Sequence, residues 1–149
     1  MEIRLASETD RNVLIRDYLQ QVYPDLEMAQ RYAEQHLRLD RALLLEEEAD
    51  VVGTLNWGMR GLPRDGMAEL TGLRLNPSQR GQGKGKFLLE AGLADMRAYF
   101  AERGAELNCV YGWLNREQAV CRAFLEGAGF QIREGLAGGW LAVRASSPS

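Results

Sequence analysis

The chain has 149 residues, of which 46% are hydrophobic and 26% charged, a balance typical of a globular protein that buries a core. A formal net charge of -3 and the lack of a lysine-arginine block argue against nucleic acid as a partner. No apolar run approaches the roughly 20 residues that span a bilayer, and Met1 does not open a signal peptide, so we expect a cytoplasmic protein without membrane contact.

We predict a single domain over residues 1–144, followed by a disordered tail over residues 145–149. The chain has one histidine, His36, and its two cysteines, Cys109 and Cys121, lack the spacing of zinc ligands. A metal site is therefore not expected.

The periodicity of apolar residues predicts six elements in the first half of the chain. In order, they are a strand at 2–6, a helix from Ser7 to about Val22, a helix capped by Asp25 and extending to about Asp40, and strands at 42–46, 51–59 and 68–75. The acidic segment Glu47-Glu48-Ala49-Asp50 is interpreted as a solvent-exposed hairpin turn.

The second half begins with a glycine-rich segment and alternates helices with strands. Its predicted elements are a helix at 84–103 that Gly104 ends, a strand at 107–114, a helix from Asn115 to 126 or 127, and strands at 130–133 and 140–143. Because the two hairpins require antiparallel pairing, this order predicts an α/β (mixed α+β) fold. We expect a central mixed sheet of about seven strands, flanked by about four helices.

The segment Arg80-Gly81-Gln82-Gly83-Lys84-Gly85 has the character of a phosphate-binding turn. Glycines let the backbone approach a ligand, and the unpaired amides and dipole at the start of a helix attract anions. ATP is a poor match, because Lys84 is followed by glycine where a Walker loop needs Ser or Thr. A dinucleotide is also a poor match, because the loop lies in mid-chain and Glu106 opens its strand.

With this loop, the sequence resembles the GNAT superfamily of N-acetyltransferases. Residues 80–85 match that family's central motif, in which Gln or Arg is followed by two residues, Gly, one residue and then Gly or Ala. A second motif, Asn followed by a helix that ends in Gly-Phe, is matched by Asn115 and by Gly129-Phe130. The order of elements agrees over residues 2 to about 144.

The resemblance implies a site for acetyl-CoA between the fourth and fifth strands, which would be parallel but splayed apart. Backbone groups of Leu73 and Leu75 would bind the pantetheine arm, and backbone amides of Arg80, Gly81, Gln82, Gly83, Lys84 and Gly85 would surround the pyrophosphate. Asn115 would lie beside the pantetheine. Phe124 would pack near the thiol end, although a plain core role accounts for it equally well.

The chemistry requires a neutral amine, so a general base is expected. Glu69 lies eleven residues before Arg80, the distance at which relatives that use a glutamate base, including histone acetyltransferases, place it. The implied catalytic residue is therefore Glu69, with an exposed strand glutamate as the alternative.

The residue expected to protonate the leaving thiolate departs from the family pattern. Many members have a tyrosine four residues before the Gly-Phe pair, and this chain has Leu125 there. Tyr111 and Cys121 are the available substitutes, although structural roles are favoured for both. The thiolate can also leave unaided, because a thiol with a pKa of about 8.5 is a tolerable leaving group.

The acceptor site of the family lies between the first two helices and the later strand loops. Residues in those regions are Tyr18, Tyr23, Tyr32, His36 and Trp57, together with the acidic Asp25 and Glu27.

The favoured hypothesis is an N-acetyltransferase, monomeric or homodimeric, whose acceptor amine is a small molecule, a protein N-terminus or a lysine. Transfer from a longer acyl-CoA or to an amino acid, and a non-catalytic acyl-CoA sensor, remain alternatives.

Overall fold

The computed structural model describes residues 1–146, which divide into two compact units. The first unit consists of Met1–Gly58 and Gly72–Ala91, and the second of Met59–Thr71 and the residues from Gly92 onward. The single domain expected over residues 1–144 stays a prediction. Of the expected tail, Ala145 is the last residue of a strand, and residues 147–149 lie outside the described residues.

Within residues 1–146 the chain contains the seven strands and four α-helices expected from the sequence. The strands are β1 (Glu2–Leu5), β2 (Arg41–Glu47), β3 (Asp50–Arg60), β4 (Met67–Leu75), β5 (Cys109–Leu114), β6 (Gln131–Glu134) and β7 (Trp140–Ala145). The helices are α1 (Arg11–Gln21), α2 (Leu26–Arg38), α3 (Lys84–Glu102) and α4 (Ala119–Gly127). The sheet has the order β1-β2-β3-β4-β5-β7-β6, which confirms the mixed α/β fold.

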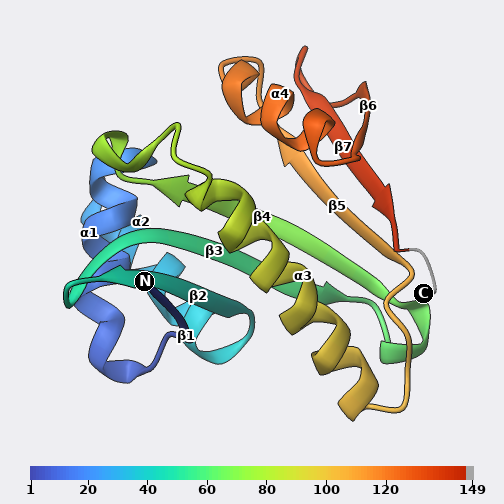
Figure 1. The fold of residues 1–149 in the computed structure, drawn as a ribbon, viewed down its shortest axis with the longest axis horizontal. Helices are drawn as coiled ribbons and strands as arrows, with labels where there is room; N and C mark the ends of the chain where they lie inside the picture. The colour runs from blue at the N-terminus through green and yellow to red at the C-terminus, as the bar shows by residue number, and fades with distance from the viewer. Residues whose placement is uncertain (147–149) are drawn as a thin grey trace. The chain divides into compact units, whose positions relative to one another are not determined.

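In the first unit, helices cover both faces of β2 and β3 (Figure 1). Leu14 of α1 and Ala33 of α2 pack against Leu44 of β2 in a fully buried cluster. The other face receives the first half of α3, because a Cβ added to Gly53 of β3 would touch the side chain of Leu88. Alternate residues of each strand therefore serve two different cores.

The hairpin between β2 and β3 turns through Glu48 and Ala49, whose φ angles are 50° and 69°. Glu47 pairs with Asp50 across this two-residue turn. Positive φ at both central residues is the geometry that matches the twist of a tight hairpin. The predicted acidic turn is thus confirmed.

In the second unit, β5, β7 and β6 are antiparallel, and β5 also pairs in parallel with β4. That parallel ladder has three residue pairs and ends at Glu69 and Tyr111, although β4 continues to Leu75 and β5 to Leu114. So short a ladder is what strands that splay apart produce. Helix α4 contacts β6 and β7.

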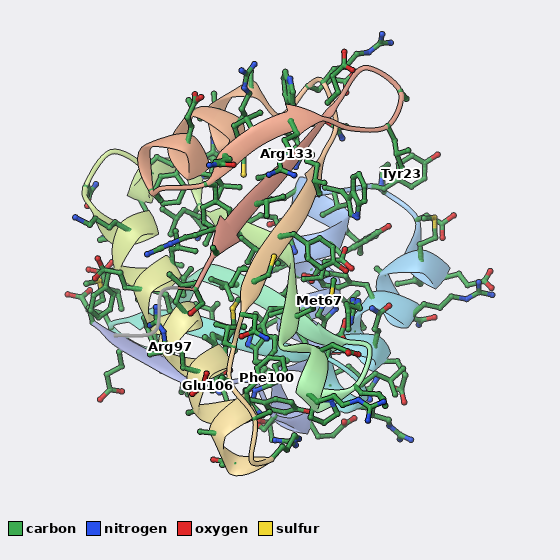
Figure 2. All side chains as sticks on the ribbon, turned by 90° about the vertical axis from the view of Figure 1, so that its right-hand side faces the viewer. Tyr23, Met67, Arg97, Phe100, Glu106 and Arg133 are labelled. Atoms are coloured by element: carbon green, nitrogen blue, oxygen red, sulfur yellow. The ribbon has the colours of Figure 1, made fainter. Side chains whose placement is uncertain are left out.

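The second half of α3 lies in the same unit and is anchored by apolar residues. Leu93, Met96 and Phe100 are buried, and Phe100 is labelled in Figure 2. Gly104, with φ of 69°, lets the Ala105 N–H return to the Phe100 carbonyl at 3.0 Å, so the helix ends where the glycine predicts.

In two places the α-helix begins later than predicted. Ser7 precedes a short 3-10 turn at Glu8–Asp10, and α1 begins only at Arg11. Gln118 Oε1 accepts from the Asn115 N–H at 2.9 Å, as a capping pair would, but α4 begins at Ala119. In both cases the polar side chain satisfies a turn that precedes the helix. No helix within residues 1–146 has the length and apolarity to cross a membrane.

Candidate functional site

The segment Arg80–Gly85 joins β4 to α3 through a backbone that favours glycine. Gly81 and Gly83 have φ angles of 76° and 78°, and a Cβ added to either would meet no atom within 4 Å. The positive φ explains why these residues are glycines. The open space beside them leaves room for a ligand to approach the backbone.

Helix α3 begins directly behind these glycines. Its first turn is closed by the hydrogen bond from the Phe87 N–H to the Gly83 carbonyl at 3.1 Å. The N–H groups of Lys84, Gly85 and Lys86 belong to that first turn, where a helix supplies no acceptor. Together with the helix dipole they favour an anion.

The two lysines of this turn differ in their surroundings. Lys84 Nζ forms an ion pair with Glu47 Oε2 at 2.5 Å and a hydrogen bond with Gln79, and its side chain is 12% exposed. Arg80 and Lys86 are exposed. The charge of Lys84 is thus directed at the β2–β3 turn, so Arg80 and Lys86 are the side chains that add positive charge at the surface of the loop.

Leu73 and Leu75, the predicted pantetheine contacts, direct their backbone groups away from β3. The N–H of Asn76, just after β4, donates to the Val52 carbonyl of β3 at 2.9 Å. Successive residues of a strand present their N–H and C=O groups to opposite sides. Leu75, and two residues earlier Leu73, therefore present theirs to the side that a ligand lying along β4 would occupy.

Glu69, the predicted base, lies in the second unit with a cationic partner. Its Oε1 accepts from Arg60 Nε at 3.0 Å, and the two side chains are 22% and 31% exposed. Tyr111 is its partner in the parallel ladder. Burial, and then the negative charge of Glu69, raise the pKa of Tyr111, which makes its phenol a weaker acid.

Asn115, the second predicted contact of the pantetheine, follows β5 in an exposed turn. Its Oδ1 accepts from the Glu117 N–H at 3.1 Å. Phe124 of α4 is half-buried, whereas Leu125, at the position where many relatives have tyrosine, is 1% exposed. The hydrophobic side chain at position 125 therefore belongs to the core of the second unit.

The aromatic residues that the sequence placed near the acceptor divide into two kinds. Tyr18, Tyr32, His36 and Trp57 are buried or nearly so, and the rings of Tyr18 and Tyr32 lie 5.0 Å apart. Tyr23, 55% exposed, projects away from the ribbon (Figure 2). The buried residues therefore belong to the interior of the first unit.

Sequence reasoning missed a largely buried polar cluster in the first unit, formed by Asp17, Tyr32, Asn56 and Arg74. Arg74 Nε donates to Asp17 Oδ2 at 2.9 Å, and Arg74 Nη2 donates to the Tyr32 hydroxyl. With its amide oxygen facing them, Asn56 accepts from Arg74 Nη2 at 3.0 Å and from the Tyr32 hydroxyl. Burial raises the pKa of Tyr32 to about 12, so the phenol stays protonated. Polar residues recurring at alternate positions of otherwise apolar strands were the available signal.

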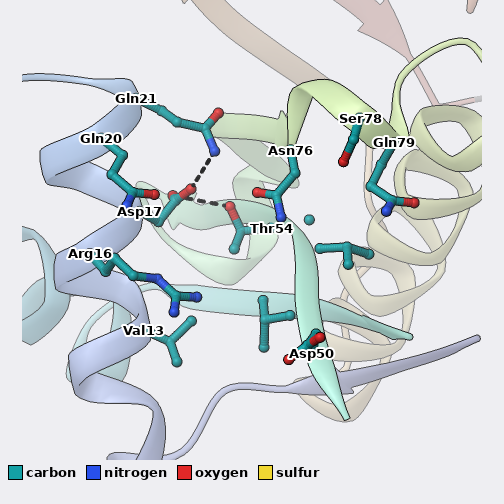
Figure 3. Close-up of a pocket in the computed structure, with 13 residues that line it drawn as sticks. Val13, Arg16, Asp17, Gln20, Gln21, Asp50, Thr54, Asn76, Ser78 and Gln79 are labelled. Atoms are coloured by element: carbon teal, nitrogen blue, oxygen red, sulfur yellow. Dashed lines mark hydrogen bonds between the residues drawn. The ribbon is translucent and has the colours of Figure 1, made fainter. Parts of the chain in front are cut away.

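Asp17 also borders an open pocket of about 460 Å³ between α1, the start of β3 and the segment after β4 (Figure 3). Gln21 Nε2 and Thr54 Oγ1 donate to its two carboxylate oxygens at 3.1 Å and 3.3 Å. The remaining lining is mostly polar, and it includes Asn76 and Gln79. The pocket therefore adjoins the segment that leads into the glycine loop.

The structure distributes the predicted site residues between the two units. Leu73, Leu75 and the loop Arg80–Gly85 follow one another in the first unit, whereas Glu69, Asn115 and Phe124 lie in the second. Among the described residues, no group of three or more His, Cys, Asp or Glu side chains is arranged to hold a metal ion.

Several solved structures that share this fold are described as acetyltransferases. The PaiA N-acetyltransferase of Thermoplasma acidophilum, in complex with coenzyme A, has a TM-score of 0.69 at 16% identity, covering 98% of this chain and 100% of its own. Tetrahymena GCN5 has a TM-score of 0.72 at 14% identity, covering 100% and 98%. The ribosomal-protein-alanine N-acetyltransferase of Brucella melitensis has a TM-score of 0.69 at 21% identity, covering 98% and 100%.

A search of curated proteins gave no match. The model of the acetyltransferase (GNAT) family, however, matches residues 11–130, most of the chain. The protein therefore belongs to the GNAT family of acetyltransferases.

Proposed function

We propose that the protein transfers an acetyl group from acetyl-CoA to an amine, with the pyrophosphate bound by the loop Arg80–Gly85. The observation that carries this proposal is the pair of positive-φ glycines, open on their Cβ side, at the start of a long helix. They offer backbone N–H groups to a dianionic ligand at close range. Family membership, and the coenzyme A bound to a protein of the same fold, support the choice of ligand.

In the reaction we propose, the neutral amine attacks the thioester carbonyl carbon. The new C–N bond forms, the C–S bond breaks, and the electron pair leaves with the CoA thiolate. Glu69 takes the proton that the amine nitrogen loses, directly or through water. Leu125 supplies no proton to the thiolate, which leaves unaided and is protonated by solvent.

The test of cofactor binding is Gly83→Val. The variant has space for its Cβ within the protein, but it places a branched side chain where the ligand would meet the backbone. Gly104→Val is a matched control, because Gly104 also has positive φ, 69°, and no atom within 4 Å of an added Cβ, but ends α3 instead of starting it. Calorimetric titration with acetyl-CoA should give binding to the parent and to Gly104→Val, and none to folded Gly83→Val. Equal binding by Gly83→Val would place the cofactor elsewhere.

The acceptor is proposed only as a class: a small amine, a protein N-terminus or a lysine. The Brucella protein of this fold is named a ribosomal-protein-alanine N-acetyltransferase, which supports including peptides with an N-terminal alanine in the panel. Incubation with acetyl-CoA and a panel of polyamines, amino acids and peptides, followed by thiol release, identifies the class. A parallel series with longer acyl-CoA thioesters tests the chain length.

A non-catalytic acyl-CoA sensor is the second candidate, favoured by one observation. The position of the family's usual tyrosine acid is occupied by the buried Leu125. A sensor would bind acetyl-CoA with an intact Gly83 and release no thiol with any amine. Thiol release above the hydrolysis rate with even one amine class would rule it out.

A further inference from the structure

We propose that Arg74 is a positioning residue for acyl-CoA. Its largely buried ion pair with Asp17 holds the end of β4 so that Leu73 and Leu75 present their backbone groups to the pantetheine arm. This inference rests on the proposed function and adds to it a role for a side chain that does not itself contact the ligand. Arg74 lies between Leu73 and Leu75 in the strand. Its side chain therefore points to the face of the sheet opposite to the side chains of the two leucines.

The contacts of Arg74 fix β4 to three other elements. Its guanidinium reaches Asp17 on α1, Tyr32 on α2 and Asn56 on β3. The side chain of Arg74 is 17% exposed and that of Asp17 is 11% exposed, while Asn56 is fully buried. A planar guanidinium with several donors in a fixed fork sets the direction of each hydrogen bond, which a flexible ammonium does not.

The same guanidinium also lies over its own strand. A Cβ added to Gly72 would be 2.8 Å from Arg74 Nη1 and 3.0 Å from Nη2. Glycine at position 72 therefore leaves room for the arginine to fold back along β4. Gly72 is not among the glycines with positive φ, so an alanine there would disturb the guanidinium without straining the backbone.

A role in stability alone accounts poorly for this arrangement. Replacing a buried ion pair by apolar residues of similar volume is often neutral or stabilising, so such a pair is weak evidence for stability. What it does supply is a single geometry. The backbone groups of Leu73 and Leu75 can bind an arm that passes along the strand only if this segment is held in place, and small displacements at a binding site are costly.

The experiment compares two probes by calorimetry at 25 °C. One is CoA, and the other is adenosine 3′-phosphate 5′-diphosphate, which is CoA without its pantetheine arm. The variants are Arg74→Lys, Gly72→Ala and the paired Arg74→Met with Asp17→Asn. The pair leaves no buried carboxylate without its cation, and the asparagine keeps an acceptor for Thr54 Oγ1. We expect Kd for CoA to rise about tenfold or more in each, while Kd for the fragment stays within about twofold.

Arg4→Met is the control for general loss of stability. Arg4 forms another partly buried ion-pair cluster in the first unit, with Asp10 and Glu46. This variant should keep the parent's Kd for both probes, and thermal unfolding of each variant shows that it is folded at 25 °C. Gly83→Val should lose both probes.

The outcomes separate the two proposals. If the parent protein binds neither probe, or binds CoA but not the fragment, the proposed role of the loop in binding the pyrophosphate is wrong. If the parent binds both, the positioning role is wrong under any of three results. These are an unchanged Kd for CoA in folded variants, an equal loss for both probes, or the same loss in Arg4→Met.

Discussion

Replacing Glu69 by glutamine should slow acyl transfer by about 10²–10⁴-fold at neutral pH, the usual contribution of a positioned general base. In free energy of activation this is about 2.7–5.4 kcal/mol, at 1.36 kcal/mol for each factor of ten. The deficit should shrink as the pH rises. An alkylamine with a pKa near 10.4 is neutral about once in 2,500 molecules at pH 7, and about a hundredfold more often at pH 9.

The surroundings of Glu69 keep this loss of rate separate from a loss of stability. Its ion pair with Arg60 spans 3.0 Å between partly exposed side chains, and such a pair contributes about 0–1 kcal/mol. Glutamine retains an oxygen that can accept from Arg60 Nε. The fold should therefore survive, and unfolding by urea should show a change of at most about 1 kcal/mol.

The assay is thiol release with a saturating amine from pH 6 to pH 9. Arg60→Gln is the matched control, because it removes the ion pair and leaves the carboxylate. If the carboxylate acts as a base, Arg60→Gln should change the rate far less than Glu69→Gln. A Glu69→Gln variant with the parent's rate across this range, or equal losses in the two variants, would refute the role of Glu69.

Three further results are expected. Leu125→Tyr, a change at a fully buried site, should lower the free energy of unfolding by about 1–3 kcal/mol through overpacking, measured by urea denaturation. A more stable variant would contradict this packing. Gly66→Ala should cost about 2–4 kcal/mol, because strain at φ of 65° is joined by contacts of 2.4–2.5 Å, whereas Gly104→Ala, without such contacts, should cost about 1–2 kcal/mol. Equal costs would refute the reasoning. The hydrogen bond from Arg4 lowers the pKa of Asp10, so the ionised carboxylate stabilises the folded state. This stabilisation is present above the unfolded-state pKa of about 3.9 and is lost as the pH falls through the folded-state pKa. The stability advantage of the parent over Asp10→Asn should therefore disappear in acid. An advantage that grew in acid would contradict a stabilising role of the ionised carboxylate.

The features that the sequence predicts well are local. Gly81 and Gly83 have the positive φ expected of a glycine loop before a helix, and Gly104 ends α3 as predicted. The turn through Glu48 and Ala49 follows from two apolar runs separated by polar residues. Each depends on residues close in the chain, where backbone preference and periodicity act directly.

The features that sequence reasoning missed depend on residues far apart. Arg74 and Asp17 are 57 positions apart, and Lys84 and Glu47 are 37 apart. Apolar periodicity says which face of an element is buried, but not which polar group of another element meets it. The insertion of β7 between β5 and β6 has the same origin, since a hairpin can join a sheet through either of its strands. Two α-helices begin later than predicted because a polar side chain can satisfy a turn as well as a helix end.

Lys84 and Lys86 are the chain's lysines, so all its other basic side chains apart from His36 are arginines. The ammonium of Lys84 is enclosed by Glu47 and Gln79, whereas Lys86 is exposed in the same helical turn. Amine-reactive reagents should thus find one accessible side chain besides the N-terminus, and it stands at the glycine loop. A fluorophore attached to Lys86 would report ligand binding without any engineered cysteine. Added CoA should protect Lys86 from an amine-acylating reagent, and mass spectrometry of proteolytic peptides separates this effect from modification of the N-terminus.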